Sequence, residues 1–173
     1  FSMTYIILRR LNMAENAQDN KPQEASIQII TQYIKDLSFE NPNAPESLIS
    51  GWPVPATQVQ ISLTQNQLNE NLFESGINIR IEAKSKEHDK MVFIVDLQYA
   101  ATVALQNIPK ENIMAVLMVE VPKLLFPFVR ETVAKITSNG GYPPLYLAPV
   151  SFEQLYVSEI KRLKAEQEKS AKQ

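Results

Sequence analysis

The stretch SIQIITQYIKDLSFENPNAP, residues 26–45, decides the fold, because apolar and polar residues alternate along it until prolines break the pattern. A period of two predicts a strand over residues 26–40. Pro42 and Pro45 then end it, since proline donates no ladder hydrogen bond. One face is expected to carry Ile27, Ile29, Tyr33, Leu37 and Phe39. The other carries Gln28, Gln32, Asp36, Ser38 and Glu40, interrupted by Ile30 and Ile34.

Three more alternating segments follow the first. The second has Val59, Ile61 and Leu63 inward, and the third has Ile77, Ile79 and Ile81 inward. The fourth runs over residues 91–105, and its first five residues are apolar on both faces. A strand of that kind is either covered twice or lies at a subunit interface.

After Pro109 the apolar spacing becomes helical, and it predicts a long helix over residues 111–136 that Pro122 and Pro127 should kink or divide. Residues 139–141, Asn-Gly-Gly, are a stop signal. Ser151 is placed to cap a last helix that begins at Phe152. Four antiparallel strands followed by helices predict an α+β fold.

The chain of 173 residues has the length of one domain. Residues 26–163 are expected to form it, between a polar, disordered N-terminal extension (1–25) and a flexible charged tail (164–173). The apolar run in residues 1–12 is too short to span a membrane and has the wrong flanks for a secretory signal. We interpret it as an extension without structural role, with an interfacial anchor as the alternative.

Composition argues against catalysis and metal binding. The chain has no cysteine and one histidine, His88, in the charged turn of residues 86–90. Neither a nucleophile with its base nor a phosphate loop is present, so we predict no enzyme and no cofactor. Asp36 and Glu40 would stand ~13 Å apart on a strand, too far for a paired acid and base. A net charge of −2 predicts no attraction to nucleic acid.

Three strings resemble the SecB family of bacterial export chaperones: KDLSFENPNAP (35–45), LFPFVRE (125–131) and PLYLAPVSF (144–152). The resemblance covers roughly residues 26–161, with Trp52 in the expected crossover loop. It implies a four-stranded antiparallel sheet backed by helices and assembled as a dimer of dimers. It also implies a cytoplasmic, ATP-independent chaperone that keeps preproteins unfolded and delivers them to SecA, without inserting into the membrane.

The resemblance also assigns residues. The contact with SecA is expected at Asp36, Glu40, Ile94 and Asp96. The tetramer contact is expected at Val95, Leu97 and Tyr99. The client-binding groove is expected at Trp52, Val59, Ile61, Leu63, Leu125, Phe126 and Leu155, although Trp52 by itself also fits a loop anchor. The family often ends in an acidic tail, whereas this chain ends in the mixed-charge KRLKAEQEKSAKQ, residues 161–173.

Two alternatives stay open. A SecB-like chaperone dedicated to another client system, such as a toxin–antitoxin pair, would keep the groove and lose the SecA contact. A small-ligand enzyme with an α+β fold would need a preformed pocket with converging polar groups.

Overall fold

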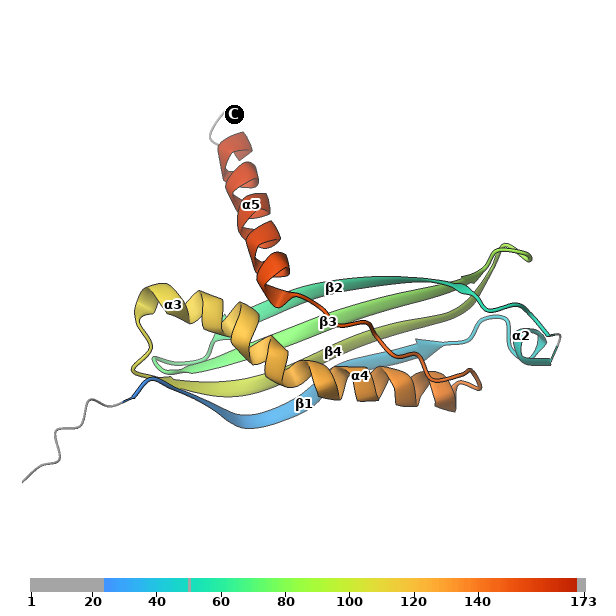
Figure 1. The fold of residues 1–173 in the computed structure, drawn as a ribbon, viewed down its shortest axis with the longest axis horizontal. Helices are drawn as coiled ribbons and strands as arrows, with labels where there is room; N and C mark the ends of the chain where they lie inside the picture. Colours follow the sequence, from blue (N-terminus) through green and yellow to red (C-terminus); the bar gives the residue numbers. More distant parts are fainter. Residues whose placement is uncertain (1–23, 50, 171–173) are drawn as a thin grey trace, which may run out of the picture.

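The computed structural model describes residues 24–49 and 51–170. The expected extension of residues 1–25 lies almost entirely outside the described residues. Four antiparallel strands form one sheet in the order β1-β4-β3-β2, and the helices follow in sequence (Figure 1). The α+β prediction is therefore confirmed. The strands are β1 Ser26–Glu40, β2 Ala56–Gln67, β3 Leu72–Ser85 and β4 Lys90–Gln106. The helices are α2 Glu46–Ile49, α3 Lys110–Ala115, α4 Val121–Asn139 and α5 Phe152–Ser170, with a π-helical turn, η1 Val116–Glu120, between α3 and α4.

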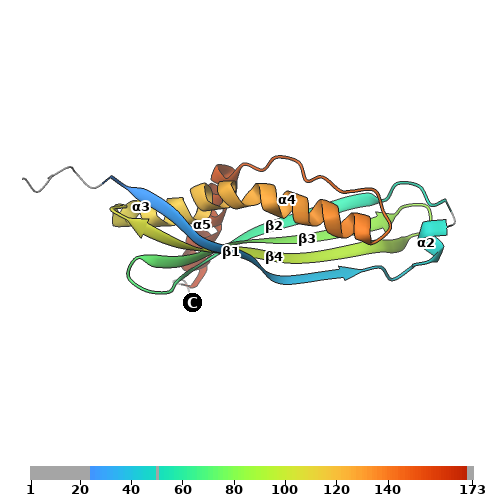
Figure 2. The ribbon, with the colours of Figure 1, turned by 90° about the horizontal axis from the view of Figure 1, so that it is seen from below.

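One face of the sheet packs against α4, as the edge-on view shows (Figure 2). The inward residues of β3 and β4 are nearly inaccessible there; Ile77, Ile81 and Val95 are each 0% exposed. From α4, Leu125, Val129 and Val133 close the core, also at 0%. The opposite face carries polar and charged side chains, among them Arg80 and Gln98, which are exposed. We call it the open face.

Strand β1 departs from the predicted alternation at two β-bulges. Its register with β4 shifts between Ile29 and Thr31 and again between Ile34 and Asp36. Each extra residue reverses the faces of those that follow, so the prediction that Tyr33 lies on the apolar face is wrong. Tyr33 is paired with Ala100, and its hydroxyl donates to Glu74 Oε2 at 2.5 Å.

The long helix is not divided by its prolines. The chain stays helical from Lys110 to Asn139. Its regular α-helical hydrogen bonding is interrupted only by the π turn η1, which ends two residues before Pro122. Proline has no N–H to give to the helix ladder, and a wider turn of this kind is a common site of adjustment. By length and composition these 30 residues could cross a membrane. However, their buried stripe packs on the sheet, which is the behaviour of a core helix.

Both helix ends follow the predicted signals. Helix α4 stops at Asn139, and Gly141 has a φ of +90°. At the start of α5, the backbone N–H of Gln154 donates to Ser151 Oγ at 3.3 Å. Helix α5 projects away from the sheet (Figure 1) and continues to Ser170, so most of the segment expected as a flexible tail has a helical backbone.

Candidate functional site

The open face brings together the four residues expected to contact SecA. Glu40 is paired with Ile94 across β1 and β4, Ser38 with Asp96, and Asp36 with Gln98. Paired residues of antiparallel strands point to the same side of the sheet. Asp36, Glu40, Ile94 and Asp96 therefore share one surface, and the two β1 carboxylates are exposed.

Arg80 of β3 lies among these acidic residues. Its guanidinium contacts Glu82 at 2.9 Å and Asp96 at 2.5 Å. The hydrogen bonds that Arg80 donates, to Glu82 first and to Asp96 second, raise the pKa of Arg80 above its ordinary value. Arg80 therefore cancels part of the negative charge that the sequence assigns to this face.

The helix-side face carries an apolar pocket at the Trp52 end of the sheet. The pocket has a volume of about 440 Å³ and is lined by fifteen residues. The lining comes from the crossover loop (Trp52, Val54), from β4 (Val92, Phe93) and from the loop after α4 (Tyr142, Leu145). Trp52 is half-buried, so its ring is both anchored and accessible. We call this cavity the Trp52 pocket.

A second hollow of about 400 Å³ lies between β2, η1 and α5. Ile61 and Leu63 of β2 line it with Met118 and Leu155, and its rim is polar. Strand β2 joins the two cavities, since Thr57 lines the Trp52 pocket and Leu63, about 20 Å further along the strand, lines the second hollow. Between them Val59 is 41% exposed. We call the path formed by Trp52, Val59, Ile61, Leu63 and Leu155 the β2 groove.

Leu125 and Phe126 do not belong to this groove. They are 0% and 8% exposed, in the layer between α4 and the sheet. Placing them in a client-binding surface was therefore wrong, and the reason is helical phase. On the same helix it is Leu124 and Phe128 that face outward, at 50% and 45% exposed.

The residues expected at the tetramer contact are also interior. Val95, Leu97 and Tyr99 point to the helix-covered side and are 0%, 1% and 8% exposed within a single chain. Their pairing partners Ile81, Ile79 and Ile77 lie in the same core cluster. The prediction that these three side chains contact another subunit directly is therefore wrong. They can influence assembly only indirectly, by supporting the helix that covers them.

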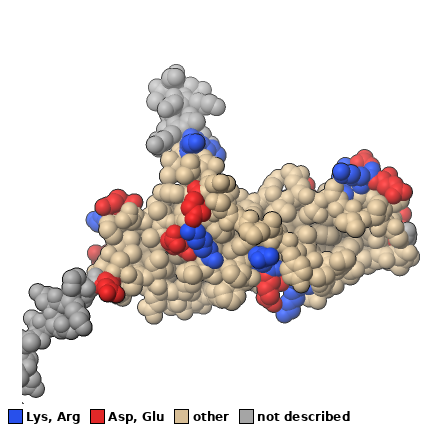
Figure 3. Space-filling model, viewed as in Figure 1, with Lys and Arg blue, Asp and Glu red and all other residues tan. Residues whose placement is uncertain are grey.

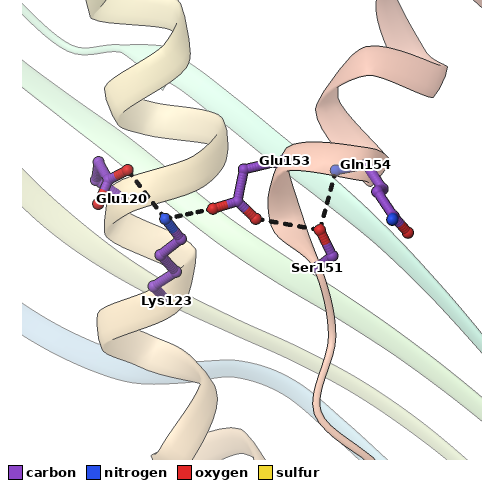
Figure 4. A network of polar contacts seen from close by, with 5 residues as sticks. All are labelled: Glu120, Lys123, Ser151, Glu153 and Gln154. Atoms are coloured by element: carbon purple, nitrogen blue, oxygen red, sulfur yellow. Dashed lines mark hydrogen bonds and ion pairs between the residues drawn. The ribbon is translucent and has the colours of Figure 1, made fainter.

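An ion-pair network fixes the base of α5 beside the β2 groove (Figure 4). Lys123 Nζ contacts Glu153 Oε1 at 2.6 Å and Glu120 Oε1 at 3.1 Å. Ser151, the cap of α5, donates to Glu153 Oε2 at 3.1 Å. Lys123, and less strongly the backbone and Ser151, holds the pKa of Glu153 below its ordinary value. This network sets where Leu155 stands against β2.

Charged side chains are sparse on this side of the molecule. In the space-filling view from the helix side they gather at the end that carries α3, at the junction of α4 and α5, at the β3–β4 hairpin tip and at the lower edge (Figure 3). Within the described residues, no group of three His, Cys, Asp or Glu side chains is placed to hold a metal ion.

The sequence matches the family of the preprotein translocase subunit SecB over residues 19–163. Among proteins of known function, it is 45% identical over 144 residues to the protein-export protein SecB of Afipia carboxidovorans, which covers 83% of this chain and 88% of that one. It is 39% identical over 157 residues to that of Nitrobacter hamburgensis, covering 89% and 98%.

The fold is similar to that of a solved SecB-like chaperone of Mycobacterium tuberculosis in complex with a ChAD peptide from the HigA1 antitoxin. The TM-score is 0.60 at 18% identity, and the match covers 72% of this chain and 91% of that one. At such low identity the likeness concerns the fold alone.

Proposed function

The chain belongs to the SecB family of protein-export chaperones, and on that premise we propose that it is a cytoplasmic homotetramer that holds unfolded preproteins in the β2 groove and passes them to SecA through the open face. The observation that carries this proposal is the row of accessible apolar side chains along β2, with a pocket at each end. The family is one of chaperones, not of enzymes.

The groove suits clients without a common sequence. Each apolar side chain that a client buries contributes about 1.5–3 kcal/mol, independent of its neighbours in sequence. Ordering the client offsets much of this gain. Binding therefore needs several apolar residues at once, and an extended client can supply them along the ~20 Å between the two cavities.

The open face suits a different partner. It is polar, and Asp36 and Glu40 of β1 are exposed on it. Exposed carboxylates attract a basic surface and accelerate docking more than they strengthen the bound state. Clients and SecA would then use opposite faces of one sheet and need not compete.

A tetramer is supported by apolar side chains that neither surface uses. Leu124 and Phe128 on α4, and Ile30 and Ile34 on the β1 edge, are about half exposed in a single chain. An unpaired edge strand with apolar side chains is a surface that proteins normally cover.

The test separates the two surfaces. Charge insertion at the groove, Ile61→Asp, should abolish suppression of aggregation of a slowly folding preprotein and leave SecA binding intact. Charge reversal on the open face, Asp36→Lys with Asp96→Lys, should do the opposite. Glu111→Lys, an exposed change on α3 that belongs to neither surface, serves as the control for altered charge. If both variants protect the preprotein as well as the unaltered chain does, client binding in the β2 groove is refuted.

A further inference from the structure

The tip of the β3–β4 hairpin packs on the wall of the Trp52 pocket. The rings of His88 and Trp52 are stacked, with centroids 4.4 Å apart and planes inclined by 29°. Lys90 Nζ lies 5.7 Å from the centroid of the same indole. These are the single histidine and the single tryptophan of the chain.

The hairpin tip is built to hold this position. The ladder continues to the pair Ser85 and Lys90. The turn between them closes when the backbone N–H of His88 donates to Ser85 Oγ at 3.3 Å. Lys84 contacts Asp89 at 2.6 Å, and Lys90 contacts Glu46 of α2 at 3.2 Å.

The residues on either side of Trp52 make few contacts of their own. Gly51 has a φ of +64° and nothing within 4 Å of the position of a β-carbon, and Val54 is 95% exposed. The neighbouring prolines, Pro53 and Pro55, donate no backbone hydrogen bond. The indole packs on one side against the hydrophobic core cluster. The stack with the exposed His88 is a further contact that fixes where the indole stands at the pocket.

We propose that His88 is a positioning residue for client binding: by stacking on Trp52 it holds the indole as a preformed wall of the Trp52 pocket. The inference rests on the proposed client role of that pocket. A wall that is already ordered costs less conformational entropy when an apolar client side chain enters. The occupant is therefore an apolar or aromatic side chain of an unfolded polypeptide.

The stack itself has a spectroscopic test in the full-length protein. Loss of the imidazole uncovers part of the indole, so emission of the single tryptophan should shift to longer wavelength in His88→Ala. His88→Phe keeps an aromatic ring at this position and should keep the emission of the unaltered chain. Emission of His88→Ala identical to that of the unaltered chain contradicts the stack.

The function of the stack is tested by anisotropy with a labelled, unfolded preprotein peptide at pH 8. His88→Ala should weaken binding about three- to fivefold, the value expected for loss of one exposed aromatic contact. His88→Phe should restore it, and Lys86→Ala, an exposed change in the same turn, should leave it unaltered. Binding by His88→Ala at full strength overturns the proposal.

Trp52→Ala distinguishes the two levels of the argument. If this variant binds clients like the unaltered chain, the client role of the Trp52 pocket fails, and the positioning role of His88 fails with it. If Trp52→Ala weakens binding and His88→Ala does not, only the positioning role is refuted.

Discussion

At the scale of single residues, Gly140 is fixed by a close approach rather than by its backbone angle. A β-carbon there would stand 2.2 Å from Phe39 Cζ, although the φ of −74° suits any residue. Gly140→Ala must push the ring out of its stack with Phe93, whose centroid is 5.8 Å away. We expect a loss of about 1–3 kcal/mol in the free energy of unfolding.

Chemical denaturation measures this loss. Asn139→Ala is the matched control, because the neighbouring side chain is exposed and has no such contact. Equal unfolding midpoints for the two variants would show that the ring moves aside without cost.

Arg80 gives a residue-scale prediction for the partner surface. Replacing it with Ala removes the cation that binds Glu82 and Asp96 and leaves the open face more acidic. Association with SecA should become about two- to fivefold faster at low salt, and the gain should vanish near 0.5 M salt, where the charges are screened.

Stopped-flow association at several salt concentrations is the measurement. Asp36→Asn should change the rate in the opposite direction. If Arg80→Ala slows association at every salt concentration, Arg80 itself contacts the partner and the acidic-face account is wrong.

At the scale of elements, the contact that holds the first turn of α5 against α4 depends on pH through Glu153. Lys123 lowers the pKa of this carboxyl from its ordinary 4.5. A depressed carboxyl pKa contributes stability that is present above the unfolded-state pKa and is lost as pH falls through the folded-state pKa. The first turn of α5 should therefore exchange its amide hydrogens faster below pH 4.5 than the intrinsic pH dependence predicts.

Hydrogen exchange with mass spectrometry on residues 151–158 tests this contact. In Lys123→Ala, the amides of this segment should exchange at pH 6 as fast as those of the unaltered chain do at low pH. Both rates are compared after correction for the intrinsic pH dependence of exchange. Lys135→Ala, an exposed lysine of the same helix, should behave like the unaltered chain. If the pH dependence persists in Lys123→Ala, a group other than the Lys123–Glu153 pair causes it.

The elements also show how far sequence reasoning reached. All four strands were predictable because alternation and proline breaks are local properties. The bulges in β1 were not, since an extra residue is defined only against the partner strand, and Tyr33 was therefore misplaced. The outward position of Arg80 was readable, but its pairing with Asp96 was not, because register depends on both strands. Leu125 and Phe126 were misplaced because the family resemblance assigned them, and a matching string does not show which side of the helix faces the sheet.

At the scale of the whole molecule, two uses of apolar surface have to be kept apart. The proposed client binding needs the β2 groove to stay accessible, whereas the proposed assembly needs other apolar side chains to be covered. The outward face of α4 fits the second use, because Leu124 and Phe128 are about half exposed on the helix that covers the sheet.

Phe128→Asp places a charge at the center of that outward face. If subunits meet there, burying the carboxylate costs several kcal/mol and assembly should fail. The particle mass should then fall from about four times 19.6 kDa to a smaller species, with the far-ultraviolet circular dichroism unchanged. Light scattering after size exclusion measures the mass.

Lys86→Asp, an exposed change at the tip of the β3–β4 hairpin and off the α4 face, is the control for added negative charge, and it should keep the full mass. The same preparations separate assembly from client capture. Because the β2 groove is formed within one chain, a smaller Phe128→Asp particle should still bind a short unfolded peptide with near-normal affinity. It should protect a full-length preprotein poorly, since fewer grooves act on one polypeptide. A four-chain mass for Phe128→Asp would place the subunit contact elsewhere, with the β1 edge at Ile30 and Ile34 as the next surface to alter.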